Sequence, residues 1–310
     1  MNPSTVSQGP GTAVALGFFD GVHLGHQALL HRAQELAARH HLTSVALTFD
    51  LHPREVLGKT GPLVYLTPLE EKVDLLRAYG MERVEVIPFT SQFATLSGRE
   101  FVVHYLVEGL GARFVVVGQD FAFGRGRSCR ASDLKSLGRP YGLQAEVLDE
   151  VRVSGQRVSS TAVRQALLTG EVTTAWQMLG RPYTLHGQVV SGRGGGRKLG
   201  FPTANLTVSE RKLLPARGVY AVQVEWGDQR CWGALNYGCR PTLDGGQWIL
   251  EVHVLDFEGN LYGQSLTLSL LRRLRRERRF PNVDALRQAI GHDVERVREL
   301  TLQFAENVLQ

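Results

Sequence analysis

The sequence contains few cysteines and no long apolar run. Only three of its 310 residues are cysteine, and none of them belongs to a C-x-x-C pair. Such a sparse, odd count argues against a disulfide framework or a structural zinc site and fits the reducing cytoplasm. No apolar run approaches the roughly 18 residues that span a bilayer, and the N-terminus lacks the charged and apolar regions of a signal peptide. We therefore expect a cytoplasmic chain with no membrane partner.

Neither sign of charge is scarce, but the balance is basic. With 35 lysines and arginines against 30 acidic residues, the net charge is +5. Positive charge favours anionic ligands, either polyphosphate metabolites or nucleic acid, and charge alone does not separate the two. At 43% hydrophobic residues the chain can bury substantial cores, and its length suggests about two domains. Residues 1–11, rich in Pro, Ser and Gly, are expected to form a flexible tail.

The first half of the chain alternates between apolar strands and amphipathic helices. Two segments, Thr67–Glu70 and Ser97–Glu100, read as capping boxes at the starts of helices. Strands that are apolar on both faces and alternate with helices predict a Rossmann-like α/β domain with a parallel sheet. The expected strands cover 12–16, 43–49, 82–88 and 114–117, and the expected helices cover 24–41, 67–79 and 97–108.

Three loops follow strands of this expected sheet, at 17–26, 50–53 and 118–127. In open parallel sheets, ligands bind beyond the carboxyl ends of the strands, so these loops should converge. No G-x-G-x-x-G follows the first strand, which disfavours a dinucleotide oxidoreductase. The three loops together are the expected ligand site of the first domain.

The loop at 17–26 ends in two histidines at the start of a helix. His23 and His26 are three residues apart, so both can project from one helix face. The free N–H groups and positive dipole of a helix N-terminus favour an anion. The alternative is that the histidines merely cap the helix or lie in solvent. The accompanying glycines favour a phosphate site.

Two further segments suit a nucleotide. The loop at 118–127 combines glycines with aromatic residues and arginines, which fits a planar or phosphorylated ligand but also an ordinary surface loop. The hydroxyls of Ser159, Ser160 and Thr161 precede a helix, and Arg164 one turn later could reach a polyphosphate there. The alternative for this second segment is an ordinary helix cap with a solvated arginine.

Three motifs of the first half together resemble a known enzyme module. F-D-G-V-H-x-G-H, a later G-x-D-F and S-S-T-x-x-R are similar to motifs of the nucleotidyltransferase module in the prokaryotic bifunctional riboflavin kinase/FMN adenylyltransferase (FAD synthetase) family. The resemblance implies that this domain joins AMP from ATP to the phosphate of FMN, forming FAD and releasing pyrophosphate. An ionised phosphate nucleophile needs little acid–base help, so alignment and charge stabilisation would carry the reaction.

The same resemblance assigns roles to individual residues. It implies that His23 and His26 are catalytic and hold the ATP phosphates. It implies ATP-binding residues at Gly17, Phe18, Asp20, His23, His26, Asp120, Ser159, Ser160, Thr161 and Arg164. It implies flavin-binding residues at His52, Pro53, Phe121, Phe123 and Arg125.

Beyond Gly180 the helices give way to short alternating strands. Val219–Trp226 and Trp248–Phe257 both alternate between apolar and polar positions, and repeated short strands of this kind predict a small antiparallel β-barrel. A helix over about 283–308 follows them. We therefore expect two domains, at 12–180 and 181–310.

The segment from Gly192 to Asn205 combines glycines with three cations. A flexible glycine backbone can wrap anionic oxygens, although the Walker A spacing G-K-[ST] is absent. Thr203 and Asn205 are two residues apart, so in an extended segment their oxygens point the same way and could share a hard cation. The alternative is a glycine-rich linker followed by a turn.

This segment resembles the G-x-x-x-G-R-x-L-G-F-P-T-A-N motif of riboflavin kinases, and three later kinase motifs follow in order. The resemblance implies MgATP-dependent phosphorylation of riboflavin to FMN. It implies that Glu251 is the general base for the riboflavin 5′-hydroxyl, where the residue pattern alone would suggest only an exposed strand glutamate. It implies ATP-binding residues at Gly192, Gly196, Arg197, Gly200, Thr203 and Asn205, metal ligands at Thr203 and Asn205, and flavin-binding residues at Arg240 and Glu251.

The run Arg272–Arg279 contains six arginines in eight residues. It could be a nucleic-acid footprint, but no aromatic residues interleave with it and no nucleic-acid motif accompanies it. We interpret it as a solvated, ligand-facing end of the barrel. The expected partners are riboflavin, FMN and ATP with Mg²⁺, and FAD as product, without a specific nucleic acid. Self-association into a homo-oligomer, and an enzyme with only one active half, are left open.

Overall fold

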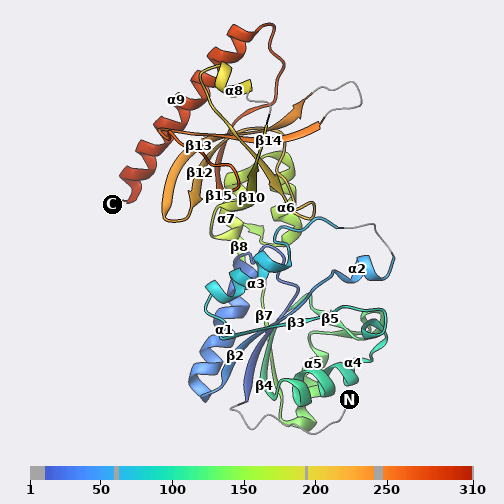
Figure 1. The fold of residues 1–310 in the computed structure, drawn as a ribbon. Helices are drawn as coiled ribbons and strands as arrows, with labels where there is room; N and C mark the ends of the chain where they lie inside the picture. The colour runs from blue at the N-terminus through green and yellow to red at the C-terminus, as the bar shows by residue number, and fades with distance from the viewer. Residues whose placement is uncertain (1–10, 59–62, 193–194, 241–246, 309–310) are drawn as a thin grey trace. The chain divides into compact units, whose positions relative to one another are not determined.

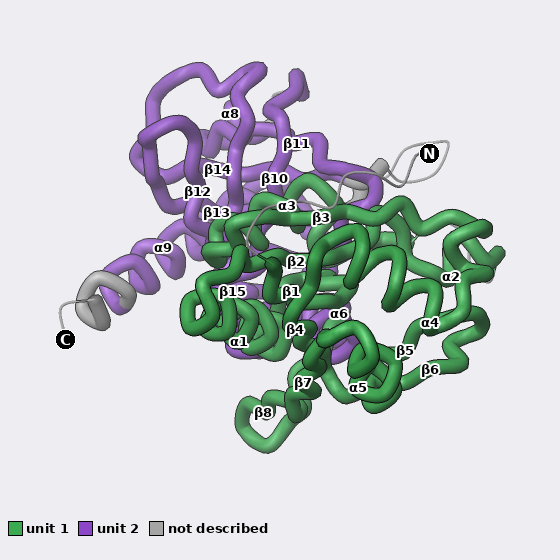
Figure 2. The backbone as a smooth tube through the Cα atoms, turned by 90° about the horizontal axis from the view of Figure 1, so that it is seen from below, with its two compact units in different colours: residues 1–160 green, residues 161–310 purple. Residues whose placement is uncertain are grey.

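The computed structural model describes residues 11–58, 63–192, 195–240 and 247–308, which Figure 1 draws as a ribbon. The chain divides into two compact units, residues 1–160 and 161–310, coloured green and purple in Figure 2. This division falls before the expected boundary at 180/181, because helix α7 (Val172–Leu179) packs on strands of the second unit. The functional boundary stays a prediction. Within the described ranges, no helix is long and apolar enough to cross a membrane.

Five parallel strands form the central sheet of the first unit, in the order β3-β2-β1-β4-β7. The predicted parallel α/β sheet is therefore confirmed, with one more strand than expected. The strands are β1 (Thr12–Leu16), β2 (Thr43–Phe49), β3 (Arg83–Ile87), β4 (Ala112–Gly118) and β7 (Gln144–Leu148). Short hairpin strands complete the unit: β5 (Ala122–Phe123) with β6 (Cys129–Arg130), and β8 (Arg152–Val153) with β9 (Gln156–Arg157).

Both faces of this sheet are buried, as its apolar strands require. Along β1, Ala13 and Ala15 belong to one core cluster, whereas Val14 and Leu16 belong to another. Alternate residues of a strand point to opposite faces, so the two clusters lie on the two sides of the sheet. The apolar stripe of α1 joins the first cluster, which fixes the helix that carries the histidines against β1.

The helices of the first unit follow the expected order with two differences. The capping box at Ser97 is present, but Thr67 is wrong as a cap because α3 begins after Pro68 without a side-chain cap. The helix expected over 97–108 is α-helical only at its start and continues as a π-helix. The elements are α1 (Leu24–His40), α2 (Pro53–Val56), α3 (Leu69–Ala78), α4 (Gly98–Glu100), the π-helix η2 (Phe101–Gly109), α5 (Asp133–Gly138) and the 3₁₀ turns η1 (Phe93–Thr95), η3 (Arg125–Arg127) and η4 (Arg139–Tyr141).

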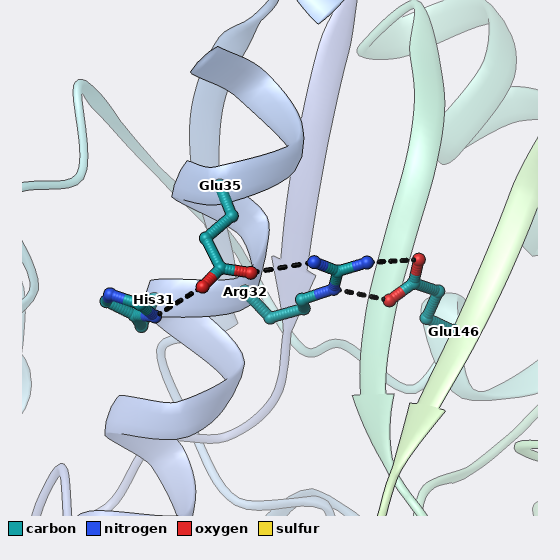
Figure 3. Close-up of polar contacts among 4 residues, drawn as sticks. All are labelled: His31, Arg32, Glu35 and Glu146. Carbon is teal, nitrogen blue, oxygen red and sulfur yellow. Dashed lines mark hydrogen bonds and ion pairs between the residues drawn. The ribbon is translucent and has the colours of Figure 1, made fainter. Parts of the chain in front are cut away.

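Arg32 ties α1 to the edge strand β7, as Figure 3 shows. Its Nε donates to Glu146 at 2.7 Å and its Nη1 donates to Glu35 at 2.7 Å. The hydrogen bonds from Arg32 hold the pKa of Glu146 below its usual range. The network therefore fixes the middle of helix α1 to strand β7 at the edge of the sheet.

The second unit is a closed antiparallel barrel of six strands, in the order β10-β11-β14-β13-β12-β15, as predicted. On β12, Tyr220, Val222 and Val224 are fully buried. Their neighbours Val219 and Ala221 face the other way and pack with Val297 of the terminal helix. The elements are α6 (Ser160–Thr169), α7, β10 (Tyr183–Val190), α8 (Gly195–Lys198), β11 (Ala204–Val208), β12 (Gly218–Trp226), β13 (Gln229–Arg240), β14 (Gln247–Val254), β15 (Ser265–Arg276) and α9 (Val283–Val308).

Candidate active sites

The loop between β1 and α1 holds an unusual backbone. Phe19 and Val22 have φ values of 55° and 42°, and Gly21 between them has 85°. Positive φ is costly for side chains of this size and persists only where surrounding contacts enforce it. Phe19 and Val22 are fully buried, so packing holds the strained turn in place.

Thr67, which precedes α3, forms two hydrogen bonds with this turn. Its Oγ1 accepts a hydrogen bond from Gly21 N at 2.8 Å, and its own N donates to Asp20 Oδ1 at 3.1 Å. Ser160 Oγ donates to the Asp20 carbonyl at 2.9 Å. The predicted ATP-binding residues Asp20 and Ser160 are thus brought together. Thr67 was missed by the sequence analysis, because its pattern resembled a helix cap.

The two histidines lie together at the N-terminus of α1. His23 is the N-cap, and its Nδ1 accepts from His26 N at 3.3 Å. Because that nitrogen accepts, the proton of a neutral His23 ring lies on Nε2. The two rings stack with centroids 3.6 Å apart. The capping alternative is therefore correct for His23, but His23 is buried rather than solvated, and capping does not exclude an anion site.

His26 carries an unsatisfied polar atom in the interior. Its Nδ1 is buried without a hydrogen-bond partner among the described residues. Burial, with the charges of His23 and Lys72 nearby, lowers the pKa of His26 well below its usual value. A buried polar atom without a partner calls for an explanation, and a ligand that reaches this helix end would supply one.

An aromatic cavity of about 480 Å³ lies beyond the carboxyl ends of β1, β2 and β4. It brings together six of the predicted residues: Phe18, His52, Pro53, Asp120, Phe121 and Phe123. Arg125 is not among its lining residues, whereas Arg127 is. The rings of Phe121 and Phe123 stack with centroids 5.6 Å apart. A cavity of this size with flat aromatic walls suits a planar heterocycle.

Several other lining residues were missed by the sequence analysis, among them Arg54, Phe89, Phe93 and Phe101. Phe89 and Phe93 follow the end of β3, so the rule that ligands bind beyond strand ends could have found them. Phe101 opens the π-helix, and its ring lies 6.0 Å from that of Phe93. π-helical segments often occur at functional sites.

The remaining predicted residues of the first site are placed as follows. Asp120 forms an ion pair with Arg157 of the β8–β9 hairpin, and Gly17 N donates to Leu47 O at 3.1 Å. Ser159 precedes α6. Thr161 and Arg164 lie in the first turns of α6, on the side of the division that belongs to the second unit.

In the barrel, the predicted base lies between two amide side chains in neighbouring strands. Glu251 on β14 is registered opposite Asn205 on β11 and opposite Asn236 on β13. Residues directly opposite each other have Cβ atoms about 5 Å apart, so the carboxylate and the two amides belong to one patch of the barrel. Asn236 was missed by the sequence analysis as a candidate.

Glu251 and Asn236 line a cavity of about 330 Å³, which also contains Thr203. Thr203 and Arg197 line a second cavity of about 260 Å³. The hydroxyl-bearing Thr203 therefore stands where the two cavities of the second unit adjoin. Two substrates that occupy one cavity each would meet at Thr203, close to Glu251.

The glycine segment makes close backbone approaches to the predicted metal ligands. A Cβ atom on Gly192 would lie 2.0 Å from Asn205 Nδ2, and one on Gly196 would lie 2.4 Å from Phe201 O and 3.0 Å from Thr203 Oγ1. Gly200 has φ +85°. The linker alternative is thus disfavoured, since a linker needs no such contacts. The side chain of Arg240, at the end of β13, lies outside the described residues.

Part of the arginine run is engaged within the fold. Arg275 forms a salt bridge with Asp293 on α9, in which its Nη2 donates to Oδ2 at 2.8 Å. Arg273 Nη1 donates to Thr169 O at 3.1 Å. Arg278 lies over the ring of Phe280 at 4.9 Å, and both line the cavity of Glu251. The run therefore contains arginines that are bonded within the fold, and two of them, Arg275 and Arg278, line this cavity.

Comparison with known proteins matches the two halves separately. The family model described as FAD synthetase matches residues 6–162, and the one described as riboflavin kinase matches residues 179–301. The bifunctional riboflavin kinase/FMN adenylyltransferase of Escherichia coli (strain K12) is 38% identical over 297 residues, 95% of each chain. That of Listeria monocytogenes is 39% identical over 277 residues, covering 88% of this chain and 87% of the relative.

A solved structure shares the whole fold. A crystal structure described as a macrolide-efflux protein from Streptococcus pneumoniae has a TM-score of 0.88 and 33% sequence identity, and it covers 96% of this chain and 97% of its own. The arrangement of an α/β unit followed by a barrel is therefore shared with a protein of similar length.

Proposed function

Since this chain belongs to the bifunctional riboflavin kinase/FMN adenylyltransferase family, we propose that each of its two reactions is carried by the residues described above in one half of the chain. The enzyme phosphorylates riboflavin to FMN and adenylylates FMN to FAD, with ATP as co-substrate of both. The observation that carries the proposal is that each half contains a ligand-sized cavity beside a cluster of the predicted residues.

In FAD synthesis, FMN lies in the aromatic cavity and ATP places its phosphates at the N-terminus of α1. A phosphate oxygen of FMN attacks the α-phosphorus of ATP, and pyrophosphate leaves. The nucleophile is already ionised, so no general base is needed. His23 donates from Nε2 and His26 from its neutral ring, and the helix N-terminus adds positive potential where charge develops.

We propose that the departing pyrophosphate is held by Ser159, Ser160, Thr161 and Arg164. The hydroxyls of Ser159 and Thr161 and the guanidinium of Arg164 are donors suited to phosphate oxygens. The Ser160 hydroxyl donates to the Asp20 carbonyl and would have to turn toward the pyrophosphate to donate to it. The nucleotide site is shaped by Gly17, Phe18, Asp20 and Asp120. The flavin is bound by His52, Pro53, Phe121, Phe123 and Arg125. Asp20 acts through the backbone that it holds, because its carboxylate accepts from Thr67 N.

In riboflavin phosphorylation, the nucleophile is a neutral alcohol and needs a base. Glu251 accepts the proton of the 5′-hydroxyl as its oxygen attacks the γ-phosphorus of ATP, and ADP leaves. The ATP phosphates are wrapped by the glycine segment, through Gly192, Gly196, Arg197 and Gly200. Arg240 and Glu251 contact the flavin.

Mg²⁺ is proposed at Thr203 and Asn205. Among the described residues, no group of three or more His, Cys, Asp and Glu side chains could hold a metal. Mg²⁺ is often bound by one or two protein oxygens together with substrate phosphates and water, and the hydroxyl of Thr203 and the amide oxygen of Asn205 fit that role. When bound, the ion neutralises phosphate charge.

Product separation tests the proposed function. The protein incubated with riboflavin and MgATP should form FMN and then FAD, and with FMN and MgATP it should form FAD directly. Excess EDTA should stop both reactions, and added MgCl₂ should restore them. FMN formation that continues in EDTA would contradict the magnesium proposal, and FMN that never becomes FAD would contradict the assignment of the first half.

Substitution of Gly196 tests the glycine segment. Gly196→Ala forces Phe201 O or Thr203 away from its position, so we expect the kcat/KM of the kinase for ATP to fall by roughly 10- to 100-fold. FAD formation from FMN should not change. Gly291→Ala on α9 is the matched control, because the nearest atom to its new Cβ is 3.9 Å away. Equal kinase activity in both variants would contradict a phosphate-wrapping role.

A further inference from the structure

A buried lysine on α3 connects the two loops of the first site. Lys72 is 2% exposed. Its Nζ donates to Phe49 O at 2.7 Å and to Phe18 O at 3.2 Å. The same Nζ lies 4.3 Å from the centroid of the Phe18 ring. The ammonium group of Lys72 therefore joins the carbonyl groups of Phe18 and Phe49, which are 31 residues apart in the sequence.

Both acceptors stand where a loop leaves the sheet. Phe49 is the last residue of β2, and its loop continues to His52. Phe18 lies just after β1, and its loop continues to His23. β1 and β2 are parallel neighbours. Lys72 thus bridges the start of the loop proposed to bind the ATP phosphates and the start of the loop proposed to bind the flavin.

The environment of Lys72 is costly for a charge. Burial lowers its pKa to about 8, and Asp20 and Asp50 oppose that shift. A buried ammonium is tolerated only where hydrogen bonds and opposite charges compensate its lost hydration. An apolar side chain would fill the same space at lower cost, but it could not donate to both carbonyl oxygens.

The two compensating carboxylates hold turns of the same two loops. Asp20 accepts from Thr67 N, as described above. Asp50 Oδ1 accepts from Leu51 N at 2.6 Å and from Phe89 N at 2.7 Å. Lys72 is therefore the centre of a polar cluster that extends into both loops and reaches Phe89 at the wall of the aromatic cavity.

We propose that Lys72 is a positioning residue for FAD synthesis, which fixes the separation of the two loops and so aligns the FMN phosphate with the α-phosphorus of ATP. This proposal rests on the function proposed above for the first site. Lys72 does not line the aromatic cavity, so it acts through Phe18 and Phe49 rather than by touching substrate.

The test is Lys72→Met in the full chain, with methionine keeping most of the side-chain length. Misplacement of reacting groups by about 1 Å can cost on the order of 100-fold in rate. We therefore expect kcat for FAD formation from FMN to fall by roughly 10- to 100-fold, whereas the KM values for FMN and ATP change less than about threefold. The riboflavin kinase activity of the same molecules should be unchanged, which shows that the chain is folded and active.

Two further variants sharpen the test. Lys135→Met makes the same change at an exposed lysine of α5 and should leave both activities unchanged. Lys72→Arg keeps the positive charge and the donors and should retain more kcat than Lys72→Met. Hydrogen exchange of peptides from β1 and β2 reports whether the sheet persists in each variant.

Three results would overturn the proposal. The first is full FAD synthesis by Lys72→Met. The second is a rise in both KM values together with fast exchange in β1 and β2, which indicates a merely structural lysine. The third is an equal loss of kinase activity. If the wild-type chain fails to convert FMN to FAD, the proposed function of the first site falls instead, so the two failures are distinguishable.

Discussion

Replacement of Glu251 by glutamine is expected to slow riboflavin phosphorylation severely and to leave FAD synthesis from FMN unchanged. Glutamine has the size of glutamate but cannot accept the proton of the 5′-hydroxyl. A positioned general base contributes about 100- to 10,000-fold to a rate, so kcat of the kinase should fall within that range. The KM for ATP should change little, because the proposed ATP ligands are other residues.

The geometry makes this substitution a clean one. Asn205 and Asn236 stand opposite Glu251 on the two neighbouring strands, and their amides can hydrogen-bond to a glutamine as well as to a glutamate. Glu210→Gln, at an exposed position of the second unit, is the control. Products are separated after incubation with riboflavin or with FMN. If the Glu251→Gln enzyme still makes FMN at the wild-type rate, Glu251 is not the general base.

Loss of either histidine at the start of α1 is expected to reduce FAD synthesis by roughly 100- to 1,000-fold, the usual effect of removing one donor to developing charge. Riboflavin phosphorylation should not change. His26→Ala removes a half-buried ring together with its buried, unsatisfied Nδ1. His31→Ala changes an exposed histidine of the same helix and should have no effect on kcat.

His23 needs a different substitution, because it also caps the helix. His23→Ala removes the cap and the imidazole together, and loss of a cap alone costs about 1 kcal/mol of stability. Asparagine is a favoured N-cap residue, so His23→Asn keeps the cap and removes only the ring. A His23→Asn enzyme with full FAD synthesis would show that His23 serves the helix and not the reaction.

Hydrophobic patterns in the sequence predicted most helices and strands, because the burial of each element determines where its apolar residues lie. β1 is apolar at every position after Thr12, and the structure buries both of its faces. The alternation on β12 likewise follows from a barrel strand with one face inside. The edge strand β7 was missed, since Gln144 and Glu146 interrupt its apolar pattern. Glu146 is polar because it pairs with Arg32, which no local pattern reveals.

Long-range partners explain most of what the sequence analysis missed in the sites. Thr67 fits a capping box, but its hydroxyl is taken by Gly21 N, a residue 46 positions away. Lys72 looks like an ordinary charged residue of an amphipathic helix, yet its ammonium is buried against two loop carbonyls. Arg275 lies in a run that reads as solvated, but Asp293 on a later helix holds it.

The glycine segment shows the opposite case, in which a sequence motif grouped residues that the structure places in close contact. The motif predicted that Gly192 and Gly196 serve the same site as Thr203 and Asn205. The structure adds the reason, which is that a methyl group on either glycine would collide with those residues or their neighbours. Close backbone approach, rather than flexibility alone, requires glycine there.

The central claim is that each half of the chain holds one complete reaction, and a mixing experiment tests it most directly. Glu251→Gln and His23→Asn proteins are incubated with riboflavin and MgATP, first separately and then together. Within the time that the wild type needs to convert its riboflavin, we predict almost no product from the first, FMN with almost no FAD from the second, and FMN followed by FAD from the mixture, because free FMN passes from one protein to the other. A mixture that stops at FMN, or FAD formed from riboflavin at the wild-type rate by either variant alone, would contradict the account.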